Sequence, residues 1–449
     1  AWNRLREMVV THTALERGST IDFDYILSTA KGYTPSLMGN EQLLMNSPVK
    51  KLTFRISVPS GGVLNFEQYN IAAKPGVTKQ NGFTTYTWVL TDLPATTRED
   101  FRPREQQNRP RIVFVGSTKA TDPMVGFASQ DAFKCEAGAE IKQAASEAVK
   151  GIDKPLLKTL KLQEKVVSEF NTWQVPMQYT GYKLQNAAAT WKSNGGSEAE
   201  KVVLLAAMLK SVNIQAEPVA VVAEKLYVNK TASPALIDRT LVKVSIQGMD
   251  PLYLSATQVD PQDLKFQLAG KRIISLVPGK KLMSEVLPEV KNQLSVSGNL
   301  TLDPSLTLAG NLNLEIGGRL NPWLRMQKDT TYTTGFLSGL LGGGKVNKVV
   351  KGKTDLDLSS FIYNISTALL TSETGGHVFL KLPSATVGSE SWHMTELVST
   401  RTESLEIPFA ISESYDMFIT IPEGMMVVTA PAVLNLANDF GSVNTSVTL

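Results

Sequence analysis

Residues 196–209 read GSEAEKVVLLAAML and carry the strongest structural signal in the chain. Ser197 is followed three residues later by Glu200, which is the spacing of a capping box. The two side chains are therefore expected to satisfy free backbone amides at the start of a helix. The apolar run from Val202 to Leu209 predicts a core helix, since it is much shorter than the ~18 apolar residues that a membrane span needs.

The segments around this helix predict an α+β domain. Residues 140–149 and 155–173 carry apolar side chains at three- and four-residue spacing, which is typical of helices. Residues 216–222, 241–246 and 252–254 follow and have the pattern of strands. Helices followed by strands within one stretch indicate a mixed layer structure.

Both ends of the chain have strand patterns. Near the start, residues 20–26, 52–58 and 85–90 alternate between apolar and polar side chains, which predicts an antiparallel sandwich. Leucines alternate again after residue 294, with expected turns at Asp303-Pro304 and Gly310-Asn311. The pattern predicts a second sandwich at the end of the chain, and four of its expected strands lie at residues 378–382, 405–409, 415–421 and 425–428.

The predicted fold is therefore an α+β multidomain protein, with a β-sandwich on each side of a helical core. A length of 449 residues suggests roughly three domains of about 150 residues. Residues 93–110 are expected to be a connecting loop, and the glycine- and lysine-rich residues 335–353 a mobile one. The predicted segments are 1–118 (sandwich), 125–265 (core), 266–375 (strand-rich connection with the glycine- and lysine-rich loop) and 376–449 (C-terminal β domain).

The composition excludes several classes of function. A net charge of +3 argues against a broad nucleic-acid surface. Cys135 is the only cysteine, so neither an internal disulfide nor a multi-cysteine zinc site can form. Imidazole chemistry is limited to His12, His377 and His393, and no cluster of acids accompanies the last two. We therefore expect no cofactor and no metal.

Residues 196–209 resemble the nucleophile helix of the transglutaminase-like family, which has a papain-type Cys-His-Asp core. In that family the pattern Gly-Asp-Cys-x-Asp-Lys precedes a Leu/Ala run. Residues 196–201 match this spacing with Glu198 at the cysteine position. Residues 213–219, NIQAEPV, are similar to the family's Gly-Ile-x-Ala-x-Pro-Val.

The resemblance also covers the other two positions of the triad. The family's histidine lies in a strand that reads roughly aromatic-Asn-His-Val-x-Val, and residues 237–244, IDRTLVKV, place Arg239 there. The third member follows in an aromatic-x-Asp-x-Thr pattern, and residues 253–257, YLSAT, place Ser255 there. The resemblance thus implies a degenerate triad of Glu198, Arg239 and Ser255, with no catalytic residue.

The flanks resemble bacterial proteins of this family that carry an uncharacterised β domain before and after the core. Residues 15–25 and 86–95 match the leading domain, and residues 401–424 the trailing one. Such proteins are usually exported, so the resemblance implies a periplasmic or cell-envelope location. Both ends of the chain look trimmed, and we expect the signal peptide to be absent from it.

The substitutions remove the chemistry that the family uses. Acyl transfer needs a thiolate, and a carboxylate such as Glu198 is a poor acyl nucleophile. Arg239 stays protonated and cannot exchange a proton as histidine does. Ser255 supplies no negative charge to orient an imidazole. We therefore predict a non-catalytic binding or scaffolding module with a protein, peptide or glycan partner.

The sequence is also compatible with other roles. Glu198 is either an ordinary first-turn glutamate, favoured by the helix dipole, or half of an ion pair with Arg239 across the former cleft. A second functional class is a hydrolase in which Glu198 acts as a general base. A third, carbohydrate binding by the β domains, follows from fold analogy alone.

Overall fold

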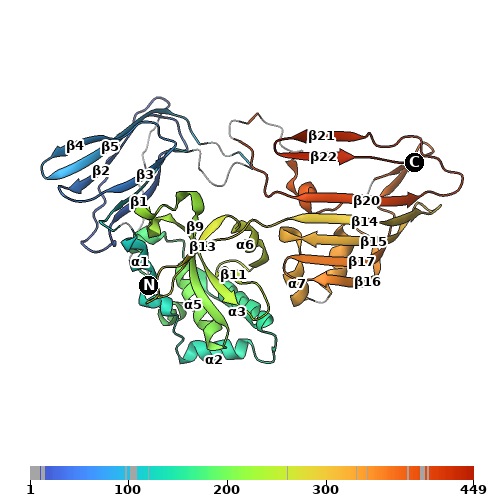
Figure 1. Cartoon of the computed structure of the whole chain (residues 1–449), viewed down its shortest axis with the longest axis horizontal. Coiled ribbons are helices and arrows are strands. Elements are labelled where there is room, and N and C mark those ends of the chain that lie inside the picture. Colours follow the sequence, from blue (N-terminus) through green and yellow to red (C-terminus); the bar gives the residue numbers. More distant parts are fainter. Residues whose placement is uncertain are drawn as a thin grey trace. The chain divides into compact units, whose positions relative to one another are not determined.

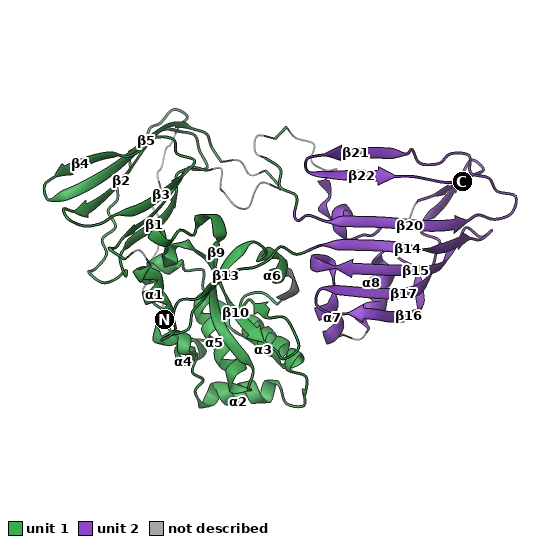
Figure 2. Cartoon of the chain, in the orientation of Figure 1, with its two compact units in different colours: residues 1–290, 400–407 green, residues 291–399, 408–449 purple. Residues whose placement is uncertain are grey.

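The computed structural model (Figure 1) describes residues 11, 16–96, 99–101, 109–119, 121–259, 261–329, 331–340, 342–381, 384–394, 400–401 and 404–449. The chain divides into two compact units (Figure 2). Unit 1 contains residues 1–290 and 400–407, and unit 2 contains residues 291–399 and 408–449.

The first part of unit 1 consists of two three-stranded antiparallel sheets. One has the order β1-β6-β3 and the other β2-β5-β4. Side chains from both sheets form one hydrophobic cluster, in which the rings of Phe54 and Phe114 lie 6.2 Å apart and those of Phe66 and Trp88 lie 5.2 Å apart. The strands are β1 (Leu37–Gln42), β2 (Val49–Pro59), β3 (Asn65–Tyr69), β4 (Gly76–Gln80), β5 (Phe83–Leu93) and β6 (Arg111–Gly116).

The predicted strand at residues 20–26 is wrong. Described residues 16–36 contain no strand, and Ile21, Phe23 and Tyr25 are 48%, 66% and 71% exposed. An alternating pattern gives a strand only where a neighbouring strand completes its hydrogen bonds, and here none of the described strands pairs with it.

The helical part of unit 1 is built around α5 (Glu198–Ser211). Every residue from Ala199 to Leu209 is buried, because other elements surround this helix on all sides. The other helices are α1 (Asp122–Ala128), α2 (Ala139–Ala148), α3 (Pro155–Glu169) and α4 (Ala187–Lys192), with two short strands, β7 (Asn171–Thr172) and β8 (Gly195–Gly196).

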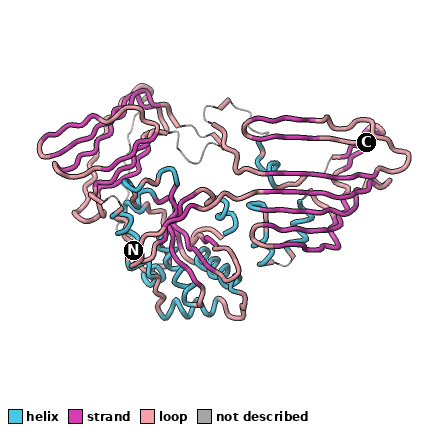
Figure 3. Tube along the Cα trace, in the orientation of Figure 1, coloured by secondary structure: helices cyan, strands magenta, loops and turns pink. Residues whose placement is uncertain are grey.

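A five-stranded antiparallel sheet with the order β11-β10-β9-β12-β13 lies beside these helices (Figure 3). The core therefore extends beyond the predicted end at residue 265. Ile273 and Ile274 are both buried because β12 is an inner strand covered on two faces, so its sequence shows no alternation. The elements are β9 (Gln215–Ala223), β10 (Ile237–Ser245), β11 (Leu252–Leu254), α6 (Pro261–Gln267), β12 (Lys271–Ser275) and β13 (Ser284–Val286).

Unit 2 contains a second five-stranded sheet, with the order β16-β17-β15-β14-β20, in which only the β14–β20 pair is parallel. One face packs against Met326, Leu337 and Leu340 of two helices. The elements of this layer are β14 (Gln293–Leu302), β15 (Leu308–Gly317), α7 (Trp323–Lys328), α8 (Tyr332–Leu340), β16 (Lys345–Thr354), β17 (Leu358–Thr367) and β20 (Ser412–Thr420). Two hairpins complete the unit: β18 (Thr371–Thr374) with β19 (His377–Leu380), and β21 (Leu434–Asn438) with β22 (Gly441–Thr445).

This architecture corrects the predictions for the second half of the chain. A sheet covered by helices stands where a second sandwich was predicted, and β20 pairs with β14, so the sheet crosses the predicted boundary at residue 376. Gly310-Asn311 lies inside β15, and the predicted strands at 405–409 and 425–428 are absent.

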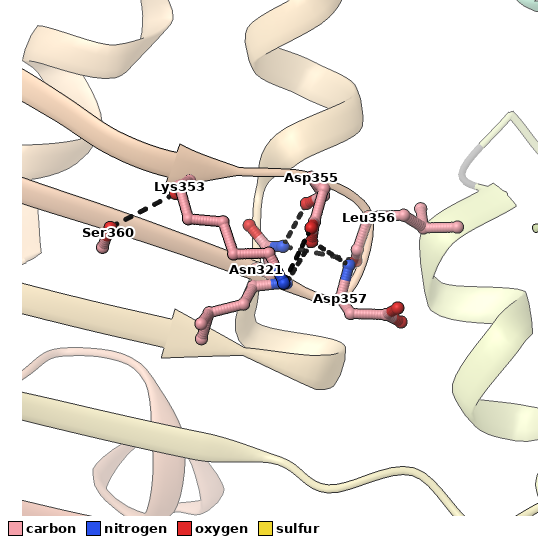
Figure 4. Close-up of polar contacts among 7 residues, drawn as sticks. Asn321, Lys353, Asp355, Leu356, Asp357 and Ser360 are labelled. Atoms are coloured by element: carbon pink, nitrogen blue, oxygen red, sulfur yellow. Dashed lines mark hydrogen bonds and ion pairs between the residues drawn. The ribbon is translucent and has the colours of Figure 1, made fainter. Parts of the chain in front are cut away.

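The predicted mobile segment 335–353 is wrong over its described residues, which contain most of α8 and of β16. The lysines of β16 belong to an edge strand, where charged side chains are common because they oppose pairing with other chains. Figure 4 shows the turn that joins β16 to β17. The Asp355 carboxylate accepts hydrogen bonds from the backbone of Asp357 and Leu358 at 3.0 and 2.9 Å, and Asn321 donates to the Asp355 carbonyl at 2.8 Å.

The chain also has seven short 3-10 helices. They are η1 (Asp131–Lys134), η2 (Met177–Thr180), η3 (Glu224–Leu226), η4 (Asn229–Thr231), η5 (Pro234–Leu236), η6 (Gly318–Leu320) and η7 (Gly388–Trp392) within the described residues.

Candidate functional site

The capping box predicted at the start of α5 is confirmed. Ser197 Oγ accepts a hydrogen bond from the Glu200 amide at 3.4 Å, and Glu200 Oε2 accepts one from the Ser197 amide at 2.8 Å. Glu200 is fully buried, and its Oε1 accepts a further bond from the Gln185 amide at 3.0 Å. The helix start is thus fixed to the α3–α4 connection.

Glu198 is the first residue of α5, and its carboxylate reaches across to β10. Oε1 accepts hydrogen bonds from the Thr240 amide at 2.5 Å and from the Thr240 hydroxyl at 3.2 Å. Burial raises the pKa of Glu198, although the Thr240 amide and the charge of Arg239 both oppose that rise. The carboxylate therefore joins the helix start to the sheet.

The ion pair considered between Glu198 and Arg239 is not formed. The Arg239 guanidinium instead donates a hydrogen bond to Gln267 Oε1 of α6 at 3.2 Å. Arg239 affects Glu198 only through its charge. The Arg239 side chain thus links β10 to α6.

Ser255 follows directly after β11 and closes a turn. Its Oγ accepts a hydrogen bond from the Thr257 amide at 3.0 Å, and the two hydroxyls are also 3.0 Å apart. Buried Gln163 of α3 donates to the carbonyls of Ser255 and Gln258 at 3.1 and 2.8 Å. Ser255 therefore shapes the chain after β11.

Arg239 and Ser255 lie in one region of the sheet, and Glu198 contacts strand β10 from the start of α5. In the β10–β11 ladder Val242 pairs with Leu254, and continuing this register would place Ser255 opposite Leu241, two residues from Arg239. Residues at that offset share a face of the sheet. No hydrogen bond or ion pair links any two of Glu198, Arg239 and Ser255, all of which are described.

Lys201 is a buried residue whose role was not predicted. Its ammonium donates hydrogen bonds to the Phe170 carbonyl at 2.7 Å and to Thr172 Oγ1 at 3.0 Å, and no ion pair with a carboxylate is present in the described part of the chain. Burial lowers the pKa of Lys201 to about 8. The pattern that residues 196–201 resemble has a lysine at this position, so the sequence drew attention to Lys201. No sequence pattern indicated that Thr240, Gln267 or Gln163 would make contacts in this region.

The remaining reactive side chains do not extend the site. Cys135 is buried, its Sγ donates to the Phe133 carbonyl at 3.3 Å, and burial raises its pKa to about 12. His377 is an exposed residue of β19, and His12 lies outside the described residues. Over the described ranges, no three His, Cys, Asp or Glu side chains are placed to hold a metal ion. None of the helices described there combines the length and apolar character that a membrane crossing requires.

The contacts of Glu198 predict a pH-dependent contribution to stability. Because folding raises its pKa, the folded chain binds this proton more tightly than the unfolded chain, and stability falls as the pH rises from 4.5 through the folded pKa. Glu198→Gln keeps an acceptor for Thr240 and removes the charge. Urea denaturation of both proteins from pH 4.5 to neutral should therefore show the wild type losing stability relative to Glu198→Gln.

A second variant checks that the contact to Thr240 matters. Glu198→Ala leaves the amide of buried Thr240 without its acceptor, so unfolding at neutral pH should become easier by about 1–3 kcal/mol. A wild type and Glu198→Gln with parallel pH profiles, or an unchanged Glu198→Ala, would contradict the assignment.

Comparisons with known proteins match both ends of the chain and its fold. Residues 2–97 match a family model described as "Domain of Unknown Function with solved-structure structure (DUF3857)". Residues 377–449 match a second family model, described as "Domain of Unknown Function with solved-structure structure (DUF3858)". A search of curated proteins finds no match.

Two solved structures are similar to the chain. The structure of "a putative protease" from Parabacteroides distasonis has a TM-score of 0.59 and 22% identity over 92% of this chain, which spans 66% of that protein's length. That of "a putative cysteine protease" from Cytophaga hutchinsonii has a TM-score of 0.25 and 11% identity, and covers 56% of this chain and 86% of its own. The chain thus matches two models of domains of unknown function, one on each side of its helical core, and shares its fold with the first of these proteins.

Proposed function

We propose that this chain is a non-catalytic, transglutaminase-like protein of the cell envelope, acting as a binding or scaffolding module. The observation that supports this most is the Glu198 carboxylate, whose hydrogen bonds to Thr240 tie α5 to β10. A group held in this way serves the fold. Arg239 and Ser255 likewise make contacts with neighbouring residues, to Gln267 and Thr257.

The chemistry of the three positions supports the same proposal. Acyl transfer in a papain-type site needs a thiolate at the helix start, and Glu198 provides only a carboxylate. Cys135 does not replace it, since it is buried and its pKa is raised to about 12. Arg239 offers a guanidinium, which has donors but no acceptor and cannot act as the base that an imidazole provides.

A second candidate is a hydrolase that uses Glu198 as a general base. One observation favours it, namely that burial raises the pKa of Glu198, as is common for catalytic carboxyls. The two proposals differ in one result. A hydrolase would lose its activity on casein or on fluorogenic peptides in Glu198→Ala, whereas the non-catalytic protein has no activity to lose.

The experiment that tests the main proposal is to rebuild the triad. We expect the wild type to show no iodoacetamide-sensitive peptide hydrolysis. In the triple variant Glu198→Cys, Arg239→His, Ser255→Asp, the new thiol lies at the N-terminus of α5, and a helix N-terminus lowers a thiol pKa. It should therefore react with iodoacetamide at neutral pH much faster than Cys135 of the wild type. Thiol-dependent hydrolysis by the wild type would contradict the proposal.

A further inference from the structure

The outer face of the five-stranded sheet in unit 2 carries a row of asparagines. Figure 2 shows the five strands side by side in the order β20, β14, β15, β17, β16. The ladder pairs Asn299 with Asn311, Asn311 with Asn364, and Asn364 with Asn347, while Phe418 of β20 pairs with Asn299. Each strand thus contributes one residue to this row.

These side chains face away from the hydrophobic core. The neighbours of Asn364, which are Tyr363 and Ile365, belong to the core cluster, so Asn364 lies on the opposite face. Phe418 is 68% exposed, between Met417 and Ile419 that pack inward. One of the two adjacent rows on the same face contains Asp416, Ser297, Asn313, Ile362 and Val350.

The amides of this face are available to a ligand. None of the side chains of Asn299, Asn311, Asn313, Asn347 and Asn364 forms a hydrogen bond within the described residues. Each amide offers two donors and an accepting oxygen. Neighbouring strands lie about 4.8 Å apart, so the four amides of the first row extend over about 14 Å.

The residue types in the two rows favour some classes of ligand over others. Neither of these rows contains Lys or Arg, and the row on the other side of the asparagines contains one lysine, Lys345, whereas a nucleic acid or another polyanion would require several basic side chains. Phe418 is their only aromatic residue, so the face lacks the cluster of aromatic and Arg anchors of a protein interface. Apart from Asp416, the polar side chains of the two rows are uncharged amides and one hydroxyl, which a neutral ligand with many hydroxyl groups matches best.

We propose that this face binds a neutral polysaccharide, laid across the strands. The hydroxyls of successive sugar residues exchange hydrogen bonds with the amides of Asn299, Asn311 and Asn364, whose spacing is close to the length of one pyranose residue in an extended chain. Phe418 supports the apolar face of a sugar ring. This site is separate from the transglutaminase-like positions, and its test does not measure their chemistry.

The test is affinity gel electrophoresis of the full chain in gels that contain soluble xylan, glucomannan, mixed-linkage β-glucan or starch, at low and high salt. We expect at least one of these polysaccharides to retard the wild type to the same extent at both salt concentrations, because the ligand is neutral. Asn299→Ala, Asn311→Ala and Asn364→Ala together, and Phe418→Ala alone, should each weaken binding at least about tenfold.

Matched controls lie on the exposed hairpin of the same unit. Asn435→Ala with Asn444→Ala removes two exposed amides elsewhere, and Phe440→Ala removes a phenylalanine that is 94% exposed. Both should bind as the wild type does. Phe418→Ala is a surface change that keeps the test valid if the triple variant does not fold. Retardation by none of the polysaccharides, or equal loss in the control variants, would overturn the proposal.

Discussion

Lys201→Ala is expected to destabilise unit 1 by about 3–5 kcal/mol, the range for removing a large buried side chain. Lys201 is fully buried, so truncation leaves a cavity in α5. It also leaves the Phe170 carbonyl and Thr172 Oγ1 without their donor, which costs more where water cannot replace it. Chemical denaturation of the full chain, in which the unfolding of unit 1 is followed, measures this loss of stability.

Lys201→Met separates the packing of this side chain from its charge. Methionine fills a similar volume and carries no charge to bury, so this variant should lose far less stability than Lys201→Ala. The two proteins should also differ in pH dependence. Because the folded pKa is about 8 and the ordinary value is 10.5, the unfolded wild type holds this proton over a range where the folded protein has released it.

The wild type should therefore gain stability relative to Lys201→Met as the pH rises from about 8 to 10.5, by up to about 3 kcal/mol. Below pH 8 both states hold the proton and the difference should be constant. A difference that stays flat up to pH 10.5, or a Lys201→Ala protein as stable as the wild type, would contradict the burial of this ammonium.

Gly310→Ala is the second substitution with a large expected effect. Gly310 lies inside β15, and a Cβ there would overlap the carbonyl oxygen of Asn299 on β14. Gly298, on the other strand, stands in the same relation to the carbonyl of Asn311. Two backbones this close leave no space for a methyl group, so either the strands separate or the sheet bends.

We expect Gly310→Ala to destabilise unit 2 by about 3 kcal/mol or more, measured as a lower denaturation midpoint. Gly335→Ala is the control within the same unit. Gly335 lies in α8 with open space around its Cβ direction, and alanine favours a helix over glycine by about 1 kcal/mol. The control should therefore be as stable as the wild type or slightly more so. Equal effects of both substitutions would show that the close approach of β14 and β15 does not limit the side chain.

Local sequence patterns predicted a helix or a strand correctly where short-range interactions or a single buried face determine it. The capping box of α5 and the apolar run after it were predicted because their partners lie within four residues of one another. The strands β2 and β5 were predicted because one face of each is packed on the core and the other is not, which produces alternation. The pattern at residues 20–26 is as regular, and it failed because a strand also needs a partner.

Contacts between residues far apart in the sequence determine the hydrogen-bond partners of the site residues, and local sequence patterns do not show these contacts. The resemblance predicted a degenerate triad at Glu198, Arg239 and Ser255, yet the sequence was equally consistent with an ion pair and with an ordinary helix glutamate at position 198. Only the fold places the Thr240 amide within reach of Glu198, 42 residues away along the chain, and Gln267 within reach of Arg239. A side chain bonds to the nearest group that satisfies it, and which group is nearest depends on how helix and sheet pack. The row of asparagines likewise exists only because the strand register aligns four distant segments.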